Sequence, residues 1–425
     1  MAQATLAATI QNSAEPEAAS SVACTADSLA GLLCCDEERM LVQLRLTNFN
    51  FLDRGFQDSI LAIMAKKKPS HPIVLSTQAL RLTIDLEYEQ AAVVWRQLIA
   101  VNPNHAQAYN WLGYNAANRG QYEDAATLLH KYAYLAPGIA NPHDSLGEVL
   151  TFTGKYAEAA QEFRKALEIQ PDFFVSILNL AQVYVQQGKL KKGLKLLHQV
   201  REQFEGTNYA RLVDYQLVRI YYTMGLTDKF RTAITEFVHK YPEDLTSRFY
   251  NSLILAQAGL TEQAEAVCDS FVLAIHEEGG AKGDGVIQQS IRRRELQAKA
   301  TLAECLGRHE QAADSWRQVL EVLEQFPPHH QFGARYRLGI NLARINSHQE
   351  VLEQAREILA INPNLITVLA LQTESALALR ELETARDSYG HLESILVGAD
   401  PDLPLRAHVD SLGQVLVRLA FPPPQ

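Results

Sequence analysis

The sequence predicts an all-α solenoid built from about nine helix–turn–helix units. The first indication is a repeat period of 34, marked by Pro103, Pro137 and Pro171, since 137 − 103 = 34 and 171 − 137 = 34. The second is that each period carries two apolar stripes spaced i, i+3, i+4, i+7, the pattern of two amphipathic helices. The third is composition: 47% of the 425 residues are hydrophobic and 21% are charged, which excludes wholesale disorder.

Two consecutive units, 106–139 and 140–173, match each other position by position. The first carries Tyr109, Leu112, Gly113, Gly120, Tyr122, Ala125, Leu129, Tyr132 and Pro137. In the second, the same positions hold His143, Leu146, Gly147, Gly154, Tyr156, Ala159, Phe163, Ala166 and Pro171. Gly120 and Gly154 fall where the first helix must end and favour left-handed backbone. The proline follows the second helix because it cannot continue one.

The same period continues, more loosely, on both sides of this pair. The residue types fit seven further units, at 72–105, 174–210, 211–244, 245–278, 293–331, 332–365 and 366–400. In the unit 211–244, Phe230 stands where a small residue is expected, so we expect local packing to differ there. Residues 404–420 place their apolar side chains on one face and are predicted to form a last helix that covers the end of the stack.

This pattern resembles the tetratricopeptide repeat, a 34-residue helix–turn–helix. The resemblance covers most of residues 72–400 and is strongest over 106–171; the stretch 108–150 is similar to bacterial repeat proteins, some of which carry kinase or cyclase domains elsewhere. It implies a right-handed α-α superhelical solenoid whose concave groove is lined by the first helix of each unit. It also implies a protein-binding role.

The domain organisation is predicted from the repeat and from two breaks in composition. Residues 1–40 have a net charge of 1 − 6 = −5, and residues 276–286 read HEEGGAKGDGV, in which four Gly indicate a loop. We therefore expect the following divisions: a flexible acidic leader at 1–40, an N-terminal helical cap at 41–71, six units at 72–278, a Gly-rich linker at 279–292, three units at 293–400, and a capping helix with a Pro-rich tail at 401–425.

Charge, cysteine content and hydropathy exclude several classes of protein. With 39 basic and 49 acidic residues, the net charge of −10 argues against a nucleic-acid partner. Five cysteines without regular spacing argue against a disulfide-stapled secreted scaffold. No apolar run reaches the ~20 residues of a membrane-spanning helix, and no basic segment precedes an apolar core as in a signal peptide. The expected location is cytoplasmic.

Motifs that carry catalysis do not occur in the sequence. There is no HExxH, GxSxG, HRD or DFG. The segment GGAKGDG lacks the preceding strand and the GK[ST] ending of a phosphate-binding loop, because Gly283 follows Lys282. We therefore expect a protein that is not an enzyme, with no cofactor and no metal site.

Candidate binding residues come from the first helix of each unit. Positions two, five, nine and twelve of a unit share a face that points away from its partner helix, and position six borders that face. In five units these positions supply the candidate peptide- or protein-binding residues Asn110, Trp111, Tyr114, Asp144, Glu148, Asn179, Gln182, Tyr215, Arg219, Tyr222, Phe249 and Tyr250.

Two interpretations of these residues stay open. Aromatic anchors and backbone-binding amides suit an extended peptide, but the same Tyr and Phe side chains would also maintain curvature by packing between helices. The chaperone-binding members of the family clamp a carboxylate with Lys, Arg and Asn. Here position five holds Asn110 and then Asp144, which disfavours such tails.

The sequence thus predicts a non-catalytic adaptor or scaffold that holds a peptide or extended protein segment in its groove. One alternative is a sensor or regulator that responds to a small signalling peptide. Another is an accessory subunit of an enzyme complex, and a third is an enzyme whose chemistry lies in the 276–292 insert or in the segment 1–71. No oligomeric state is predicted.

Overall fold

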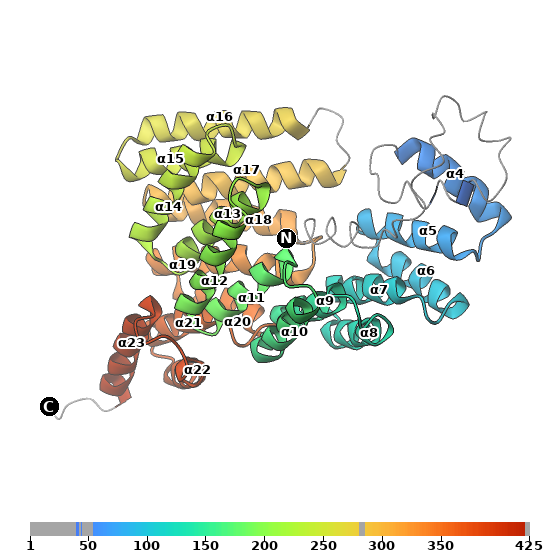
Figure 1. The fold of residues 1–425 in the computed structure, drawn as a ribbon. Coiled ribbons are helices and arrows are strands. Elements are labelled where there is room, and N and C mark those ends of the chain that lie inside the picture. The colour runs from blue at the N-terminus through green and yellow to red at the C-terminus, as the bar shows by residue number, and fades with distance from the viewer. Residues whose placement is uncertain (1–39, 42–43, 45–53, 280–284, 421–425) are drawn as a thin grey trace. The chain divides into compact units, whose positions relative to one another are not determined.

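The computed structural model describes residues 40, 41, 44, 54–279 and 285–420, and throughout these ranges its regular structure is helical (Figure 1). A first helix, α4 (Arg54–Lys67), precedes the repeats and lies within the segment expected to form the N-terminal cap. The last, α23 (Pro404–Ala420), has the bounds predicted for the capping helix. The predicted leader, apart from Met40, and residues 421–425 of the tail lie outside the described residues.

Between these two helices, α5 to α22 form nine successive pairs, which are the units that the period predicts. Their bounds are α5 (Pro72–Ile84), α6 (Tyr88–Val101), α7 (Ala106–Asn118), α8 (Tyr122–Leu135), α9 (Asn141–Phe152), α10 (Tyr156–Ile169), α11 (Phe174–Gln186), α12 (Leu190–Gln203), α13 (Asn208–Thr223), α14 (Thr227–Lys240), α15 (Leu245–Gln257), α16 (Thr261–Gly279), α17 (Gly285–Cys305), α18 (His309–Leu323), α19 (Phe332–Arg344), α20 (His348–Leu359), α21 (Ile366–Ala378) and α22 (Leu382–Leu396). A short 3₁₀ helix, η2 (Pro328–Gln331), lies between α18 and α19. The predicted all-α helical-repeat solenoid is confirmed.

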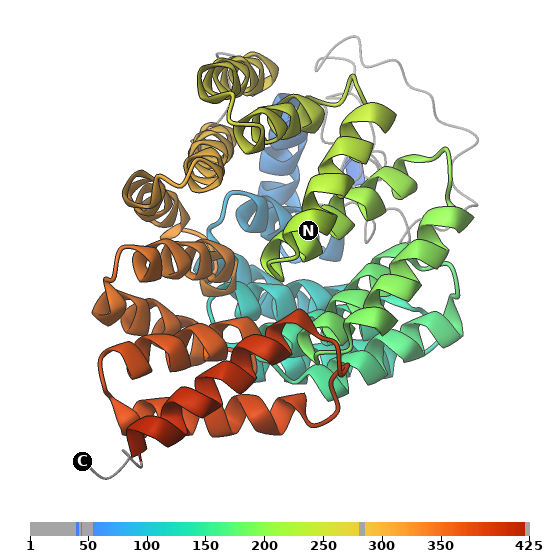
Figure 2. The ribbon, with the colours of Figure 1, turned by 90° about the vertical axis from the view of Figure 1, so that its left-hand side faces the viewer.

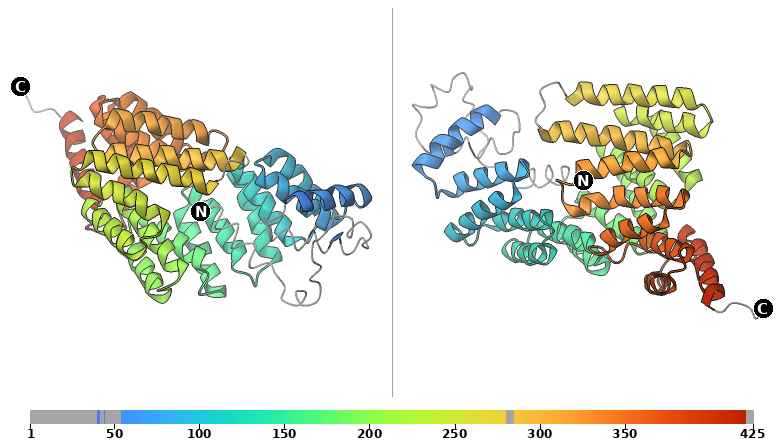
Figure 3. Two further views of the ribbon diagram at one scale, coloured as in Figure 1. Left: turned by 90° about the horizontal axis from the view of Figure 1, so that it is seen from above. Right: turned by 180° about the vertical axis from the view of Figure 1, so that it is seen from behind.

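The chain divides into two compact units. Unit 1 comprises Met1–Val149 and Lys165–Val175, and unit 2 comprises Leu150–Arg164 and Ser176–Gln425. In unit 1, the core between α5, α6 and α7 centres on the buried Trp95, whose ring stacks on Trp111 with centroids 6.2 Å apart. In unit 2, α15 to α19 pack one against the next (Figure 3). None of the helices over the described ranges is long and apolar enough to cross a membrane.

The turn chemistry predicted from sequence is confirmed. Gly120 and Gly154 have φ of 77° and 73°, the left-handed conformation that ends a helix. Inside unit 1, Gly113 of α7 faces α8 so closely that a Cβ added there would lie 2.8 Å from Leu129 Cγ. The close approach of the two helices therefore depends on a residue without a side chain.

The loop predicted over 276–286 is shorter than expected. Helix α16 continues through Gly279 and α17 begins at Gly285, so only residues 280–284, which lie outside the described ranges, separate them. The two helices pack against each other, and His276 Nε2 of α16 lies 3.3 Å from Glu295 Oε2 of α17. This packing outweighs the low helix propensity of glycine.

Unit 2 closes on itself in a way that the repeat does not predict. The loop between α20 and α21 contacts the end of α9, the turn that follows it and the start of α10. Tyr156 Oη donates to Asn362 Oδ1 at 3.2 Å, Asn362 Nδ2 donates to Thr151 O at 3.1 Å, and Asn364 Nδ2 donates to Gly154 O at 2.9 Å. We call this contact the seam. In Figure 2 the helices of unit 2 run from green through yellow and orange, and the orange-red end returns to the green helices.

A second contact completes the closure of unit 2. The loop after α22 reaches the turn before α12, where Asp400 N donates to Gly188 O at 3.0 Å and Asp400 Oδ2 accepts from Lys191 N at 2.6 Å. The Lys191 ammonium also pairs with Asp402 at 2.8 Å. Helices from the beginning and the end of this unit's sequence are therefore neighbours in space.

Candidate functional site

The predicted binding residues all lie on the first helices of successive pairs. Unit 1 holds five of them, on α7 and α9, and unit 2 holds seven, on α11, α13 and α15. The structure places them in three settings: a buried polar cluster in unit 1, an exposed surface in unit 2, and internal contacts within each unit.

The cluster in unit 1 joins equivalent positions of two neighbouring repeats. Tyr114 Oη of α7 donates to Glu148 Oε2 of α9 at 2.8 Å, and the two residues are 34 positions apart. One helical turn earlier, Asn110 and Asp144 form the equivalent pair of positions, and both are fully buried. Neither amide atom of Asn110 has a hydrogen-bond partner among the described residues. We call Asn110, Tyr114, Asp144 and Glu148 the acidic cluster.

Burial dominates the electrostatics of the acidic cluster. It raises the pKa of Glu148 above its ordinary value of 4.5, although the hydrogen bond from Tyr114 partly opposes this. Burial also raises the pKa of Tyr114 well above 10, and the nearby charges of Glu148 and Asp144 add to the effect. The carboxyl groups of Asp144 and Glu148 thus both lie in a poorly hydrated site. Among the described residues, no three His, Cys, Asp or Glu side chains are grouped to hold a metal ion.

The exposed surface in unit 2 lies on α11 and α13. Gln216 Nε2 donates to Gln182 Oε1 at 2.8 Å, and Arg219 donates to Gln216 Oε1 at 3.3 Å. The Arg219 guanidinium lies over the ring of Tyr215, 6.0 Å from its centroid, and 41% of Tyr215 is exposed. The exposed ring of Tyr215 and the exposed Arg219 therefore lie beside two amides, of which that of Gln216 is buried and hydrogen-bonded to Gln182 and Arg219. Gln216 was not among the predicted residues.

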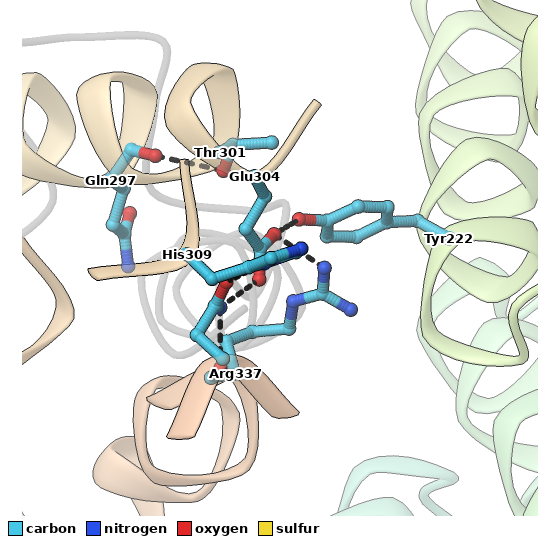
Figure 4. A network of polar contacts seen from close by, with 7 residues as sticks. Tyr222, Gln297, Thr301, Glu304, His309 and Arg337 are labelled. Atoms are coloured by element: carbon cyan, nitrogen blue, oxygen red, sulfur yellow. Dashed lines mark hydrogen bonds and ion pairs between the residues drawn. The ribbon is translucent and has the colours of Figure 1, made fainter. Parts of the chain in front are cut away.

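Tyr222, in contrast, is engaged by the chain itself (Figure 4). Its hydroxyl donates to Glu304 of α17, and the Arg337 guanidinium of α19 lies over its ring at 3.9 Å from the centroid. Arg337 and Asn341 both donate to Glu304, and His309 Nδ1 lies 3.0 Å from Asn341 Oδ1. This Tyr222 network ties α13 to α17 and α19 inside unit 2.

In the Tyr222 network, the protonation states of Tyr222 and Arg337 suit their hydrogen bonds to Glu304. Burial raises the pKa of the Tyr222 hydroxyl well above 10, so the hydroxyl stays protonated and can act as the hydrogen-bond donor to Glu304. Burial opposes the charge of Arg337, yet Tyr222 and Glu304 together raise the pKa of the guanidinium. Tyr222 thus stabilises the packing of α13 on α17 and α19, and its ring is covered by Arg337 and is not available to a partner.

The remaining predicted residues are mostly packed. Trp111 stacks on Trp95, as described above. Tyr250 is buried, with its ring 5.1 Å from that of Phe237, and the ring of Phe249 lies 5.4 Å from that of Phe271. Asn179 is partly buried on α11. These aromatic side chains pack between helices, as the second of the two interpretations of the sequence expects.

Sequence reasoning missed Glu304 and Arg337, although the signal was present. Counted from the first residue of their units, Glu304 occupies position twelve, as Tyr222 does, and Arg337 occupies position six. Applying the same positional rule to the units 293–331 and 332–365 would have put both residues on the inner face. That rule would not have shown that these residues contact Tyr222.

Comparisons with known proteins agree with this description. Two family models described as tetratricopeptide repeat match residues 86–140 and 153–214. No curated protein matches the chain.

Solved structures resemble the chain at low sequence identity. That of PilF from Pseudomonas aeruginosa is 18% identical, covers 51% of this chain and 98% of its own, and has a TM-score of 0.40. A structure of the APC/C hetero-tetramer Cut9–Hcn1 is 11% identical, covers 90% of this chain and 62% of its own, and has a TM-score of 0.47. The TPR domain of P58(IPK) is 14% identical, covers 82% and 99%, and has a TM-score of 0.29.

Proposed function

We propose that this chain, which is a tetratricopeptide-repeat protein, is a non-catalytic adaptor that holds an extended segment of a partner protein against the first helices of its repeats. Repeats of this kind present a continuous surface because each unit stacks on the next. The proposal involves no cofactor and no nucleic acid. The cytoplasmic location stays a prediction.

The observation that carries the proposal is the exposed Tyr215–Arg219 pair beside the amide groups of Gln182 and Gln216. Tyrosine and arginine are the residues on which binding energy most often concentrates, and amide side chains hydrogen-bond to the backbone of an extended segment. Tyr215 is 41% exposed although it lies on the first helix of its pair, and it is not among the buried core residues. A surface that combines these groups suits a peptide better than a small apolar ligand.

The test compares two double variants in affinity capture from an extract of the source cell. Y215A/R219A removes the pair from α13, while K131A/Y134A removes a matched pair from α8, a second helix, where the Lys131 ammonium lies 4.8 Å from the Tyr134 ring centroid. Tyr134 is 76% exposed, so neither variant opens the core. Helicity is monitored by circular dichroism.

We expect Y215A/R219A to lose captured proteins that K131A/Y134A and the wild type retain. Partner capture that is the same for all three proteins would contradict the proposed surface. The absence of any partner captured by the wild type would contradict the adaptor function itself.

A further inference from the structure

The faces of α13 and α17 that meet in unit 2 carry residues beyond the Tyr222 network. Tyr215 precedes Tyr222 by 222 − 215 = 7 residues, about two helical turns, so both lie on one face of α13. Arg293 precedes Glu304 by 304 − 293 = 11 residues, about three turns, so both lie on one face of α17. Because Tyr222 contacts Glu304, these two faces meet (Figure 4). Arg293 therefore lies on the side of α17 that faces α13.

Two arginines lie beside Tyr215 on these faces. The Arg219 guanidinium lies over the Tyr215 ring, 6.0 Å from its centroid. Surrounding atoms desolvate Arg293 and lower its pKa, and Tyr215 acts in the opposite direction, which places Arg293 near Tyr215. Tyr215 and Arg219 are exposed and Arg293 is partly exposed, so a bound segment can reach all three side chains. We call Tyr215, Arg219 and Arg293 the cationic surface.

Neither guanidinium of the cationic surface has an acidic partner among the described residues. Arg219 makes one hydrogen bond, to the neutral amide of Gln216 at 3.3 Å, and Arg293 makes none within the part of the chain that the structure describes. Each guanidinium has five N–H donors, so most donors of the pair are available to a ligand.

Two carboxyl groups near the cationic surface are paired with other arginines. Glu304 of α17 accepts from Arg337, and Asp244, directly before α15, pairs with Arg211 at 2.5 Å. The positive charge of the cationic surface is therefore not compensated by the described residues. An anionic group placed there would gain charge-assisted hydrogen bonds from two guanidinium groups at once.

We propose that the cationic surface binds the carboxylate of an Asp or Glu side chain in the extended partner segment. This inference rests on the proposed adaptor function and names the residue class that the partner segment carries. The guanidinium groups of Arg219 and Arg293 donate to the carboxylate oxygens, and the exposed ring of Tyr215 packs on the methylene groups of the acidic side chain. A neutral amide of the same shape would not gain from the positive charge.

Synthetic peptide pools provide the probe. Heptapeptides with random uncharged flanks, acetylated and amidated at their ends, carry Glu, Gln or Lys at the centre, and a fourth pool carries central Gln and a free carboxyl terminus. Binding to the full chain is measured by surface plasmon resonance. We expect the Glu pool to bind about tenfold more tightly than the capped Gln pool, which corresponds to about 1.4 kcal/mol. The Lys pool should bind most weakly.

Matched variants locate the preference. R219Q/R293Q removes both charges of the cationic surface and breaks no ion pair of the described residues, so we expect it to fold and to bind the Glu and Gln pools equally. R248Q removes a charge from an exposed position of α15 in the same unit and should retain the preference for Glu. R219E/R293E should prefer the Lys pool, a reversal that a merely structural role of the two arginines would not produce. Circular dichroism monitors the helicity of each variant.

Several outcomes would overturn the inference. One is equal binding of the Glu and capped Gln pools to the wild type, another is a preference for Glu that survives R219Q/R293Q, and a third is that no pool binds. Tighter binding of the free carboxyl terminus than of the Glu pool would assign the surface to a chain end instead of a side chain. The capture experiment decides the adaptor function separately. Partners that are captured by the wild type and lost with Y215A/R219A, together with equal binding of the Glu and Gln pools, would overturn this inference alone.

Discussion

Two buried glutamates, one in each unit, show how local partners set the behaviour of a carboxyl group. Glu148 has a tyrosine hydroxyl as its partner, and burial raises its pKa above 4.5. Burial acts in the same direction on Glu295, but hydrogen bonds from Lys299, Arg292 and His276 outweigh it and lower the pKa to about 2. The same residue type therefore opposes folding in one place and supports it in the other.

The substitution E148Q should stabilise the chain at neutral pH. A carboxyl group whose pKa is raised on folding contributes its full stability below the unfolded value of about 4.5, and that contribution is lost as the pH rises through the folded value. The glutamine side chain has no charge to bury, so the advantage of the variant over the wild type should grow between pH 4.5 and pH 7. Urea unfolding across this range measures it. An E148Q chain less stable than the wild type at pH 7 would contradict the account.

The substitution E295Q should have the opposite effect. A carboxyl group whose pKa is lowered on folding contributes stability above about pH 4.5, and the contribution is lost as the pH falls through about 2. Because the basic partners are about half exposed, we expect a loss of about 1 kcal/mol at pH 7. Urea unfolding at pH 7 and pH 3 should show a smaller difference at the lower pH. An equal loss at both values would point to packing and not to charge.

At the residue scale, the sequence indicates which positions face inward but not how they are used. The positional rule selects Tyr215 and Tyr222 equally, since both lie on the inner face of α13. The structure leaves Tyr215 exposed and engages Tyr222 with Glu304 and Arg337. That difference depends on contacts between α13 and helices that are several repeats further along the chain. A pattern that recurs once in every helix pair does not encode such contacts.

At the scale of the helix pair, small residues determine how closely two helices approach. G113A should destabilise unit 1 by roughly 1–3 kcal/mol, because the added methyl group would lie 2.8 Å from the nearest atom of the Leu129 side chain. G138A is the matched control, since a Cβ at Gly138 meets nothing within 4 Å. Thermal unfolding of both variants tests this prediction. Equal melting temperatures for G113A and G138A would show that α7 and α8 can move apart without a loss of stability.

Helix pairs were the most predictable elements, for a physical reason. Each pair buries its apolar stripes against its sequence neighbours, so a local period is sufficient to specify it. The bounds of a Gly-rich segment were less predictable. Residues 276–279 read as a loop by composition, yet they extend α16 because the helix packs on α17 and His276 meets Glu295.

At the scale of the whole chain, the repeats of unit 2 do not remain an open array. The seam brings Asn362 and Asn364 against residues 211 and 210 positions earlier in the sequence. Neither separation is a multiple of the repeat period. Pro363 lies between these two residues, at the position near the end of a repeat where the period predicts a proline. The period does not predict that Asn362 and Asn364 contact a distant repeat.

Opening the seam should make unfolding less cooperative. An open solenoid is stabilised only by contacts within each repeat and between nearest neighbours. A closed one has an additional contact that links distant repeats, so these repeats should unfold together. N362A/N364A removes the three side-chain hydrogen bonds of the seam. We expect a broader urea transition with an earlier onset. N251A, at an exposed position of α15, is the control and should leave the transition unchanged. An unchanged transition for both variants would show that the closure adds nothing to stability.

The adaptor proposal is tested most directly by hydrogen–deuterium exchange of the chain with and without a captured partner. The account predicts slower exchange in the first helices, above all in α11 and α13 around Gln182 and Tyr215. Second helices such as α8 should not change. Protection confined to second helices would contradict the claim that the first helices hold the partner.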